Sequence, residues 1–386
     1  MTWNSIPLGD IALQRGGSVD PKKHQDEVFE LYSIPAFDAG APEIASGSEI
    51  GSSKKEVQTN DVMLSRIVPH IRRAWVVGSA NGKRQIASGE WIVFRSDGIW
   101  PPYLRWVLVG DEFHSVFMRT VSGVGGSLLR ARPAEVFKIK VPLPPLAEQK
   151  RIAAILDAAD ALRAKRRESL AQLDRLLQST FLELFGDPVT NPKGWTQGLV
   201  GDVVHFAKDG PHVSPKYADS GIPFLSARHI KPGEVIWDDL KYIDQEEAER
   251  QWTKCKPELG DILYTKGGTT GIAARVRTSE PFAVWVHVAL LRPIANKVNN
   301  VWLESMLNSH YCYVQSQRYT HGIANRDLGL TRMVKIKILL PPLAEQNHFA
   351  TIVESIERQK TRLRAHLAEL DNLFASLQSR AFNGQL

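Results

Sequence analysis

One seven-residue segment, LPPLAEQ, occurs twice in this chain, at Leu143–Gln149 and unchanged at Leu340–Gln346. After both copies the two sequences stay in register, without a gap, for nearly forty residues. Seven identical residues in a row do not arise from composition alone, so the chain contains an internal repeat. A repeat of this length predicts two similar structural units and an approximate two-fold axis within a single chain.

The segment after each copy is predicted to be one long helix. Apolar residues recur there in alternating steps of four and three, the spacing of a narrow coiled-coil seam. The predicted seam residues include Leu156, Leu170, Leu173, Leu177, Val353, Leu367, Leu370 and Phe374. The Pro pair precedes each helix, where a missing amide donor costs nothing. Helices this long with one apolar stripe need a partner, so we expect them to form an antiparallel pair. The alternative is two unrelated surface helices on separate cores.

The sequence before each helix repeats more faintly. Asn60–Arg66 resembles Gly260–Lys266, and segments Val136–Val141 and Val334–Leu339 alternate apolar and charged residues as half-buried strands do. The predicted fold is therefore mixed α+β: two α/β globules and two long helices in a coiled coil with pseudo-two-fold symmetry. The predicted divisions are a first globule at 1–142, a central helical region at 143–187, a second globule at 188–339 and a C-terminal helical region at 340–386.

Length, charge and cysteine content narrow the class of protein. A chain of 386 residues fits two cores with connectors. A net charge of +6 favours an anionic partner. Two cysteines cannot build a disulfide framework, and no Cys/His spacing is typical of a zinc site, so we expect a reduced, cytoplasmic protein without a metal. We find no signal peptide and no apolar run long enough to span a bilayer.

Motifs for catalysis are weak. Trp100–Tyr103 imitates the polar-Pro-Pro-aromatic signature of amino-methyltransferases, but an indole cannot accept the hydrogen bond that their first residue accepts. Lys266–Gly271 is Gly-rich but lacks the order of a phosphate-binding loop. Asp61 and Asp261 stand in Asn-Asp and Gly-Asp contexts that are typical of turns. We therefore predict no catalytic residue and no cofactor.

Basic residues gather at matching places in the two globules. Arg66 and Lys266 are the strongest candidates for DNA contacts, because the repeat puts both at the end of corresponding strands, next to Ser65 and Thr265. Arg can pair with guanine, whereas Lys, Ser and Thr mostly hold phosphates. The other candidates are Arg72, Arg73, Lys83, Arg84, Lys208, His212, Lys216, Arg275 and Arg326. An ordinary solvated charge is the alternative for each of them.

The order globule, LPPLAEQ-helix, globule, LPPLAEQ-helix resembles the specificity subunits of type I restriction-modification systems. The resemblance rests on Leu143–Gln149, Leu340–Gln346 and the helices after them, and it covers essentially the whole chain. It implies that each globule is a target recognition domain for one half of a split site in double-stranded DNA, with the helices as a spacer. It also implies a non-catalytic chain that docks two methyltransferase subunits, one of which flips the target adenine, and restriction subunits that translocate and cut DNA. The residues implied at the helix starts and docking faces are Leu146, Glu148, Gln149, Leu343, Glu345 and Gln346.

One departure and three alternatives remain. Asn347 and His348 stand where the first repeat has Lys150 and Arg151, and Leu363 stands where it has Arg166, so the two docking faces are not identical. One alternative is a single-chain DNA methyltransferase or nuclease with its own recognition domains, which would need the motifs missing above. A second is a coiled-coil scaffold whose globules bind protein. A third is a specificity-like subunit of a different anti-phage complex.

Overall fold

The structure is a computed structural model of the 386-residue chain, described here for residues 3–13, 16–123, 129–322 and 326–386. It contains two compact units, one of Met1–Glu168 with Ala365–Leu386 and one of Ser169–Arg364. We refer to them as unit 1 and unit 2. Each is a β-rich globule together with one end of each long helix.

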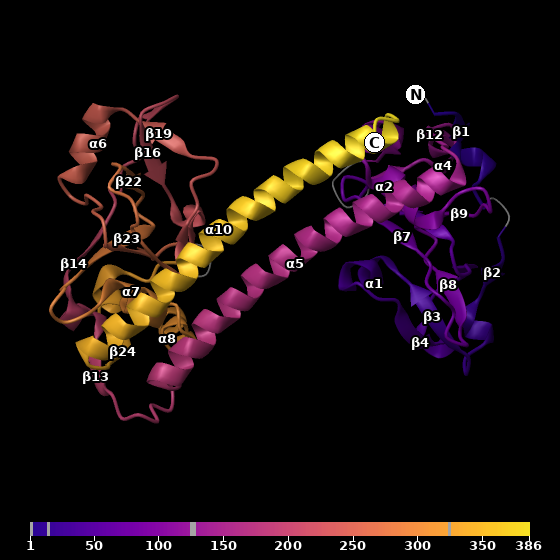
Figure 1. The fold of residues 1–386 in the computed structure, drawn as a ribbon. Helices are drawn as coiled ribbons and strands as arrows, with labels where there is room; N and C mark the ends of the chain where they lie inside the picture. Colours follow the sequence, from indigo (N-terminus) through magenta and orange to yellow (C-terminus); the bar gives the residue numbers. More distant parts are fainter. Residues whose placement is uncertain (1–2, 14–15, 124–128, 323–325) are drawn as a thin grey trace. The chain divides into compact units, whose positions relative to one another are not determined.

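Both LPPLAEQ segments lead into a helix of 40 residues, α5 (Leu146–Phe185) and α10 (Leu343–Phe382). The two helices pack antiparallel (Figure 1), which confirms the predicted pair. All eight seam residues named above are buried or half-buried, as a seam requires. Leucines off the seam are open to solvent: the exposed fraction is 53% at Leu162 and 47% at Leu176. The periodicity of the sequence therefore determines which helix face is covered.

One ion pair between the helices occurs twice, with the roles of the helices exchanged. In unit 1, Arg163 Nε of α5 lies 2.6 Å from Asp371 Oδ1 of α10. In unit 2, Lys360 Nζ of α10 lies 2.8 Å from Asp174 Oδ1 of α5. Arg163 and Lys360 occupy the same place in the repeat, as do Asp174 and Asp371. Such partly exposed pairs contribute modestly to stability but favour one register of the helices.

The glutamine of each LPPLAEQ segment has the same structural role in its unit. Both Gln149 and Gln346 are 1% exposed. Gln149 Oε1 accepts from Trp100 N at 2.8 Å, and Gln346 Oε1 accepts from Asn299 N at 2.9 Å. Their Nε2 groups donate to Pro144 O and Pro341 O. Each glutamine therefore joins the start of its long helix to the start of a helix in the globule.

Unit 1 contains a five-stranded sheet in the order β2-β5-β8-β3-β4 and a three-stranded antiparallel sheet in the order β7-β6-β9. The core around the second sheet includes Ile152 and Leu156 of α5 together with Phe374 and Ala381 of α10. The elements of the globule are β1 (Ser5–Pro7), β2 (Ser18–Val19), β3 (Val28–Tyr32), α1 (Ile34–Ala39), β4 (Glu43–Ser46), β5 (Lys54–Glu56), β6 (Val62–Ser65), β7 (Ala74–Val76), β8 (Arg84–Ala87), β9 (Trp91–Phe94), α2 (Pro101–Val109), α3 (Asp111–Phe117), β10 (Val121–Ser122), β11 (Arg130–Ala131), α4 (Pro133–Val136) and β12 (Lys140–Pro142).

Unit 2 contains two four-stranded sheets, β14-β23-β20-β21 and β15-β19-β16-β22. Its largest core cluster includes Phe181 and Phe185 of α5 with Phe349 and Val353 of α10. The elements of the globule are β13 (Thr196–Leu199), β14 (Val204–Asp209), β15 (Tyr217–Ala218), β16 (Ile222–Leu225), β17 (Ile230–Lys231), β18 (Glu234–Val235), β19 (Lys241–Ile243), α6 (Gln245–Trp252), β20 (Ile262–Thr265), β21 (Ala273–Arg275), β22 (Ala283–Val284), β23 (Val288–Pro293), α7 (Asn300–Leu307), α8 (His310–Tyr319), α9 (Leu330–Met333) and β24 (Lys337–Leu340).

The faint repeat of the globules corresponds to a shared frame. Sheet β7-β6-β9 of unit 1 matches β21-β20-β23 of unit 2 in strand order and direction. The aspartate before the central strand accepts two hydrogen bonds from one arginine in both units, Asp61 from Arg95 and Asp261 from Arg292. Asp61 and Asp261, which the sequence placed in turns, are thus buried counter-ions. They bind an arginine at the end of β9 in unit 1 and of β23 in unit 2.

The predicted strands before each LPPLAEQ segment begin later than expected. Val136 ends the short helix α4, and the strand β12 starts only at Lys140. In unit 2 the strand β24 starts at Lys337 instead of Val334. Between helix and strand, the carbonyl of Ile139 accepts from Leu8 N, and that of Ile336 accepts from Val200 N. The alternation is real, but its first half belongs to the end of a short helix and the turn after it, whose lysines Lys138 and Lys335 are exposed.

Gln346→Ala is predicted to destabilise the chain by about 1–3 kcal/mol, because it removes the buried partner of Asn299 N and leaves that donor unsatisfied. The free energy of unfolding in urea measures the loss. Glu345→Ala is the matched control, since Glu345 is the exposed neighbour on the same turn and its replacement should change stability by less than about 0.5 kcal/mol. Equal effects of the two variants would contradict the role assigned to the glutamine.

Candidate nucleic-acid interface

The strongest candidate interface in each unit is the tip of the shared sheet, where β6 or β20 ends. Arg66 N donates to Glu90 O, and Lys266 N donates to His287 O, so each basic residue lies beside the start of the neighbouring strand. Isolated β-bridges link Ile67 to Arg130 and Gly267 to Asp327. The repeat therefore brings three corresponding positions together at both tips.

In unit 1 the three positions hold two arginines and one acid. Glu90 pairs with Arg66 at 3.1 Å and with Arg130 at 3.1 Å. The side chains of the two arginines remain 33% and 39% exposed. Burial acts to raise the pKa of Glu90, but the guanidinium groups of Arg130 and Arg66 outweigh it and hold the pKa below its usual range. The tip of unit 1 thus carries one excess positive charge and several N–H donors.

In unit 2 the tip has a different balance of charge. Lys266 Nζ lies 3.0 Å from Asp209 Oδ2 and 3.1 Å from Asp327 Oδ1, so one cation is held by two acids. Asp209 also binds Lys254, and His212 lies 3.4 Å from it. Burial acts to raise the pKa of Asp209, but its two lysine partners lower it overall. Asp209 therefore organises several cations at the end of β14.

Four of the predicted DNA-contacting residues lie inside the units, and the expectation of exposed contacts is corrected for them. Ser65, Arg73, Thr265 and Lys266 are at most 7% exposed. Ser65 Oγ donates to Ile67 O, and Thr265 Oγ1 accepts from Ile272 N. Arg73 forms two hydrogen bonds of 2.8 Å to Asp38. Ser65, Thr265 and Lys266 lie at the strand ends that the repeat predicted, but their side chains are already bound within the fold.

The remaining predicted residues are accessible to different degrees. In unit 1, Arg72 pairs with Asp111, Arg84 pairs with Glu56, and Lys83 is half-exposed. In unit 2, Lys208, His212, Lys216 and Arg326 are exposed. Lys208 and Lys216 form no ion pair with any residue in the described ranges. Exposed cations without an ion pair are what a phosphate backbone attracts, although Lys208 Nζ also lies 4.8 Å from the centre of the Phe206 ring.

Sequence reasoning offered Arg130 only as a weaker candidate for a DNA contact, past Gly123, and missed Asp209, Lys254 and Asp327. Asp327 could have been found, because it occupies the same place as Arg130 relative to the two LPPLAEQ segments. Asp209 and Lys254 had no signal, since they reach Lys266 from elements 57 and 12 residues away. The Trp100–Tyr103 segment opens α2, and the Tyr103 hydroxyl donates to Pro142 O in the interior, so this motif is structural.

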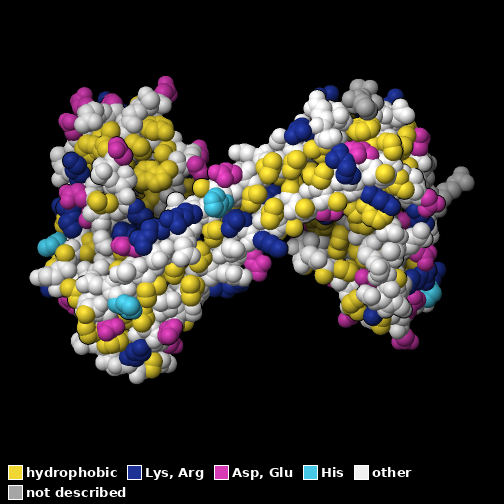
Figure 2. Space-filling model, in the orientation of Figure 1, with side chains coloured by type: hydrophobic (Ala, Val, Ile, Leu, Met, Phe, Trp, Pro, Cys, Tyr) yellow, Lys and Arg dark blue, Asp and Glu magenta, His cyan; other side chains and the backbone are white. Residues whose placement is uncertain are grey.

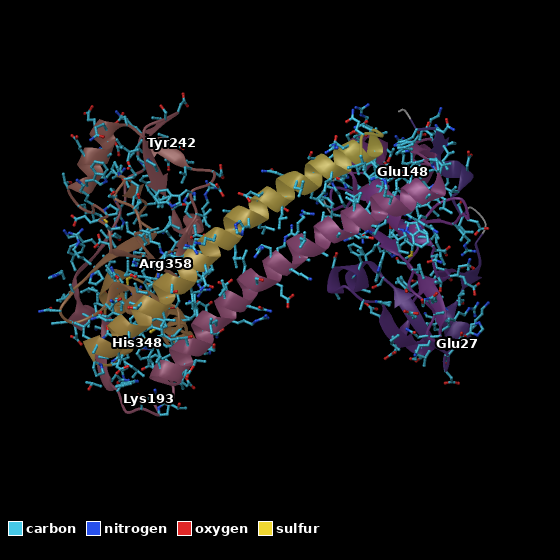
Figure 3. All side chains as sticks on the ribbon, viewed as in Figure 1. Glu27, Glu148, Lys193, Tyr242, His348 and Arg358 are labelled. Atoms are coloured by element: carbon cyan, nitrogen blue, oxygen red, sulfur yellow. The ribbon has the colours of Figure 1, made fainter. Side chains whose placement is uncertain are left out.

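The residues predicted at the helix starts divide into two groups. Leu146 and Glu345 are exposed, and Glu148 and Leu343 are half-exposed, with Glu148 paired to Arg151 at 2.7 Å. Figure 3 shows Glu148 on the first turn of α5 and His348 on the second turn of α10. Gln149 and Gln346 are buried and face the globules. Hydrophobic side chains interspersed with Lys and Arg run along the visible flank of the helices (Figure 2).

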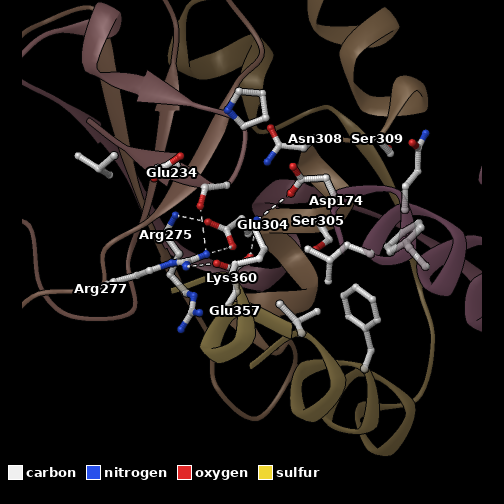
Figure 4. A pocket seen from close by; sticks show the side chains of 18 of the residues that line it. Asp174, Glu234, Arg275, Arg277, Glu304, Ser305, Asn308, Ser309, Glu357 and Lys360 are labelled. Atoms are coloured by element: carbon white, nitrogen blue, oxygen red, sulfur yellow. Dashed lines mark hydrogen bonds and ion pairs between the residues drawn. The ribbon is translucent and has the colours of Figure 1, made fainter. Parts of the chain in front are cut away.

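Unit 2 also contains a hollow of about 1010 Å³ beside the helices (Figure 4). Arg277 lies 3.4 Å from Glu304 and 3.3 Å from Glu357 at its edge. Burial raises the pKa of the Glu304 carboxyl, despite the neighbouring arginines. Arg275, predicted as a DNA contact, lines this hollow and does not belong to the tip.

No group of three or more His, Cys, Asp or Glu that could hold a metal ion occurs in 3–13, 16–123, 129–322 or 326–386. Within the same ranges, none of the helices combines the length and the apolar character that crossing a bilayer requires.

Comparison with known structures shows the fold. The S subunit of a type I restriction-modification system from M. genitalium is 12% identical, with a TM-score of 0.59 over 99% of this chain and 96% of that one. A chain from a structural study of complex assembly and conformational transition in a type I system is 20% identical, with a TM-score of 0.60 over 100% of this chain and 98% of that one.

Comparison with known sequences shows the family. The specificity subunit of the type I restriction enzyme EcoBI from Escherichia coli is 26% identical over 283 residues, and that of EcoKI from Escherichia coli K12 is 22% identical over 312 residues. The matches cover 64% and 70% of this chain, but only 58% and 63% of the length of those relatives. The family model of the type I restriction modification DNA specificity domain matches residues 113–173 and 192–370. The chain therefore belongs to the family of type I restriction-modification DNA specificity domains.

Proposed function

We propose that this chain is the DNA sequence-recognition subunit of a type I restriction-modification complex and that it catalyses no reaction itself. Support comes from family membership together with the duplicated frame of the two units. The observation that favours it most is the exchanged ion pair, Arg163–Asp371 in one unit and Lys360–Asp174 in the other. Two recognition globules on one antiparallel helix pair match a protein that reads two separate half-sites.

The two globules act as target recognition domains, residues 1–142 and 188–339, and each reads one half of a bipartite site in double-stranded DNA. The tips of the shared sheets have different hydrogen-bonding character, which favours different half-sites. Arg66 and Arg130 contribute N–H donors in unit 1, and Asp327 contributes a half-exposed acceptor in unit 2. The exposed cations Lys208, Lys216 and Arg326 bind phosphates and hold the register on the duplex.

The helical regions, residues 143–187 and 340–386, act as the spacer between the half-sites. A helix of 40 residues spans about 60 Å at 1.5 Å per residue. The apolar seam and the ion pairs between the helices prevent one helix from sliding along the other. A rod of fixed register makes half-site separation a geometric property of the protein.

The accessible flanks of the helices dock two methyltransferase subunits, and restriction subunits complete the assembly in the cytoplasm. Exposed Leu146, Leu162, Leu176 and Leu373 support this, because apolar side chains on a charged helix flank favour a protein partner. Methylation and cleavage belong to these partners. A methylome of the source cell tests the whole proposal: deletion of this gene removes one bipartite methylated motif, and an unchanged methylome in a methylating strain contradicts it.

Lys208→Ala is predicted to lower the slope of log Kd against log salt concentration by about 1, because one phosphate contact and its released counter-ion are lost. The measurement is fluorescence anisotropy on the methylome-defined duplex, with the methyltransferase subunits present. Lys335→Ala is the matched control, since Lys335 is also exposed. It follows Val334, whose carbonyl oxygen accepts a hydrogen bond from the segment before β14, whereas Lys208 lies near the end of β14. If the slope of log Kd against log salt concentration changes equally in both variants, Lys208 does not contact a phosphate.

Inserting one seam-preserving heptad into each helix, after Glu168 and after Arg364, should lengthen the DNA spacer and leave both half-sites unchanged. Seven residues add about 10.5 Å of helix, which corresponds to about three base pairs. The methylated motif of cells that carry only the altered gene reports the spacer directly. An unchanged spacer, or an altered half-site, would show that the helices do not set the distance.

Asp209→Asn should destabilise the chain by about 1–3 kcal/mol at pH 7, since Lys254 and Lys266 lose a charged partner. The folded pKa of Asp209 is depressed, so its contribution is present above its unfolded pKa and is lost as pH falls through the folded pKa. The difference from wild type should therefore shrink in urea titrations at pH 7, 5 and 3.5. Asp239→Asn, at the exposed Arg228 pair, is the control. A difference that stays constant with pH would contradict the assignment.

A further inference from the structure

The hollow in unit 2 lies where α7 and β21 of the globule face the two long helices (Figure 4). One wall is apolar, with Leu177 and Phe181 of α5 opposite Val353 of α10. Exposed apolar residues surround it, with exposed fractions of 45% at Leu182 and 42% at Trp237. Its volume of about 1010 Å³ is at the upper end of the range for ligand pockets.

Among the described cations that line the hollow, Arg275 is the one whose guanidinium forms no hydrogen bond or ion pair, although the carboxylates of Glu304 and Glu357 act on it electrostatically. Lys360 is held by Asp174 at 2.8 Å and by Glu357 at 3.0 Å, and Arg277 is held by Glu304 and Glu357. No hydrogen bond or ion pair joins the Arg275 guanidinium to any residue that the structure describes, and its Nε is buried. A half-buried guanidinium next to an apolar wall is complementary to a carboxylate.

The internal repeat shows what fills the corresponding place in unit 1. The glutamines Gln149 and Gln346 bind the first residues before α2 and α7 in the same way, so the two helices correspond and Trp106 matches Ser305. The Trp106 ring is 4% exposed and lies 5.3 Å from the Phe374 ring of α10. Its Nε1 donates to Asp157 of α5 at 2.8 Å. An indole therefore covers the seam between globule and helices in unit 1.

In unit 2 the place of this indole is open. Ser305 is small, and Leu177 stands where unit 1 has Phe374, so the hollow continues down to α5. The corresponding hollow of unit 1 is smaller, about 700 Å³, and Trp106 forms part of its wall. None of the described residues that line this smaller hollow comes from α10, because Trp106 lies between the hollow and that helix.

We propose that the hollow of unit 2 binds an aromatic side chain of a partner polypeptide, a Trp or Tyr with an acidic residue nearby. The ring takes the place that Trp106 fills in unit 1, between Ser305 and Leu177, and the carboxylate pairs with Arg275. The inference rests on the proposed function in one respect, since the partner is the methyltransferase subunit of the complex. It makes the two docking faces unequal, because unit 1 supplies its own indole and unit 2 receives one.

Ser305→Trp tests this by building the indole of unit 1 into unit 2. The variant should keep a melting temperature at or above that of wild type, because it fills a hollow with a ring that the repeat already accommodates. Its affinity for the methyltransferase subunit, measured by calorimetry on the full chain, should fall by about tenfold or more at one of two sites. Ser305→Ala keeps the hollow open and should bind as wild type does.

A second variant and a probe keep the test decisive if Ser305→Trp folds poorly. Arg275→Gln should weaken the same site by about three- to tenfold. Indole-3-propionate, which carries a ring and a carboxylate, should compete with the subunit on wild type and less on Arg275→Gln. The inference is overturned if folded Ser305→Trp binds the methyltransferase subunit as wild type does. It is also overturned if Arg275→Gln binds as wild type does and indole-3-propionate does not compete. No association of the methyltransferase with wild type would instead contradict the proposed function.

Discussion

The packing of α5 against α10 is the interaction on which both units depend. Neither globule has a complete core without both helices: Phe185 and Phe349 lie 5.4 Å apart at one end, and Trp106 lies 5.3 Å from Phe374 at the other. Burial of each such aromatic ring contributes on the order of 1.5–3 kcal/mol. The middle of the pair has only half-buried seam residues, so the helices are anchored mainly by the globules. A slip of register would disrupt both cores at once.

The two units share the backbone frame and the buried hydrogen bonds of the repeat, but they differ in the side chains at the tips of their sheets. Buried groups with a demanding geometry recur, such as Gln149 and Gln346 or the aspartate–arginine pairs before β6 and β20. Exposed groups at the sheet tips do not recur: Glu90 corresponds to His287, and Arg130 corresponds to Asp327. Since an unsatisfied buried donor costs more than a changed surface charge, the interior tolerates less divergence than the tips.

Sequence reasoning recovered what depends on local periodicity and missed what depends on distant partners. The long helices and every seam residue were predictable, because a steady four-three spacing over 40 residues has one structural interpretation. The burial of Lys266 was not, since it depends on Asp209 of β14 and on Asp327, 61 residues further along the chain. The hollow in unit 2 was also not predictable. It follows from Ser305 standing opposite Leu177, a pairing that exists only once α7 packs on α5.

Under the proposed function, the different charge balance of the two tips would let one frame serve two unlike half-sites. In unit 1, two guanidinium groups share one carboxylate, and their remaining N–H donors would suit the O6 and N7 acceptors of guanine. In unit 2, Asp327 pairs with Lys266 and Arg332 and stays half-exposed, and its carboxylate would suit an exocyclic amine of adenine or cytosine. A protein with two identical tips would read a palindrome. The changes from Glu90 to His287 and from Arg130 to Asp327 are sufficient, in hydrogen-bonding terms, to make the proposed bipartite target asymmetric.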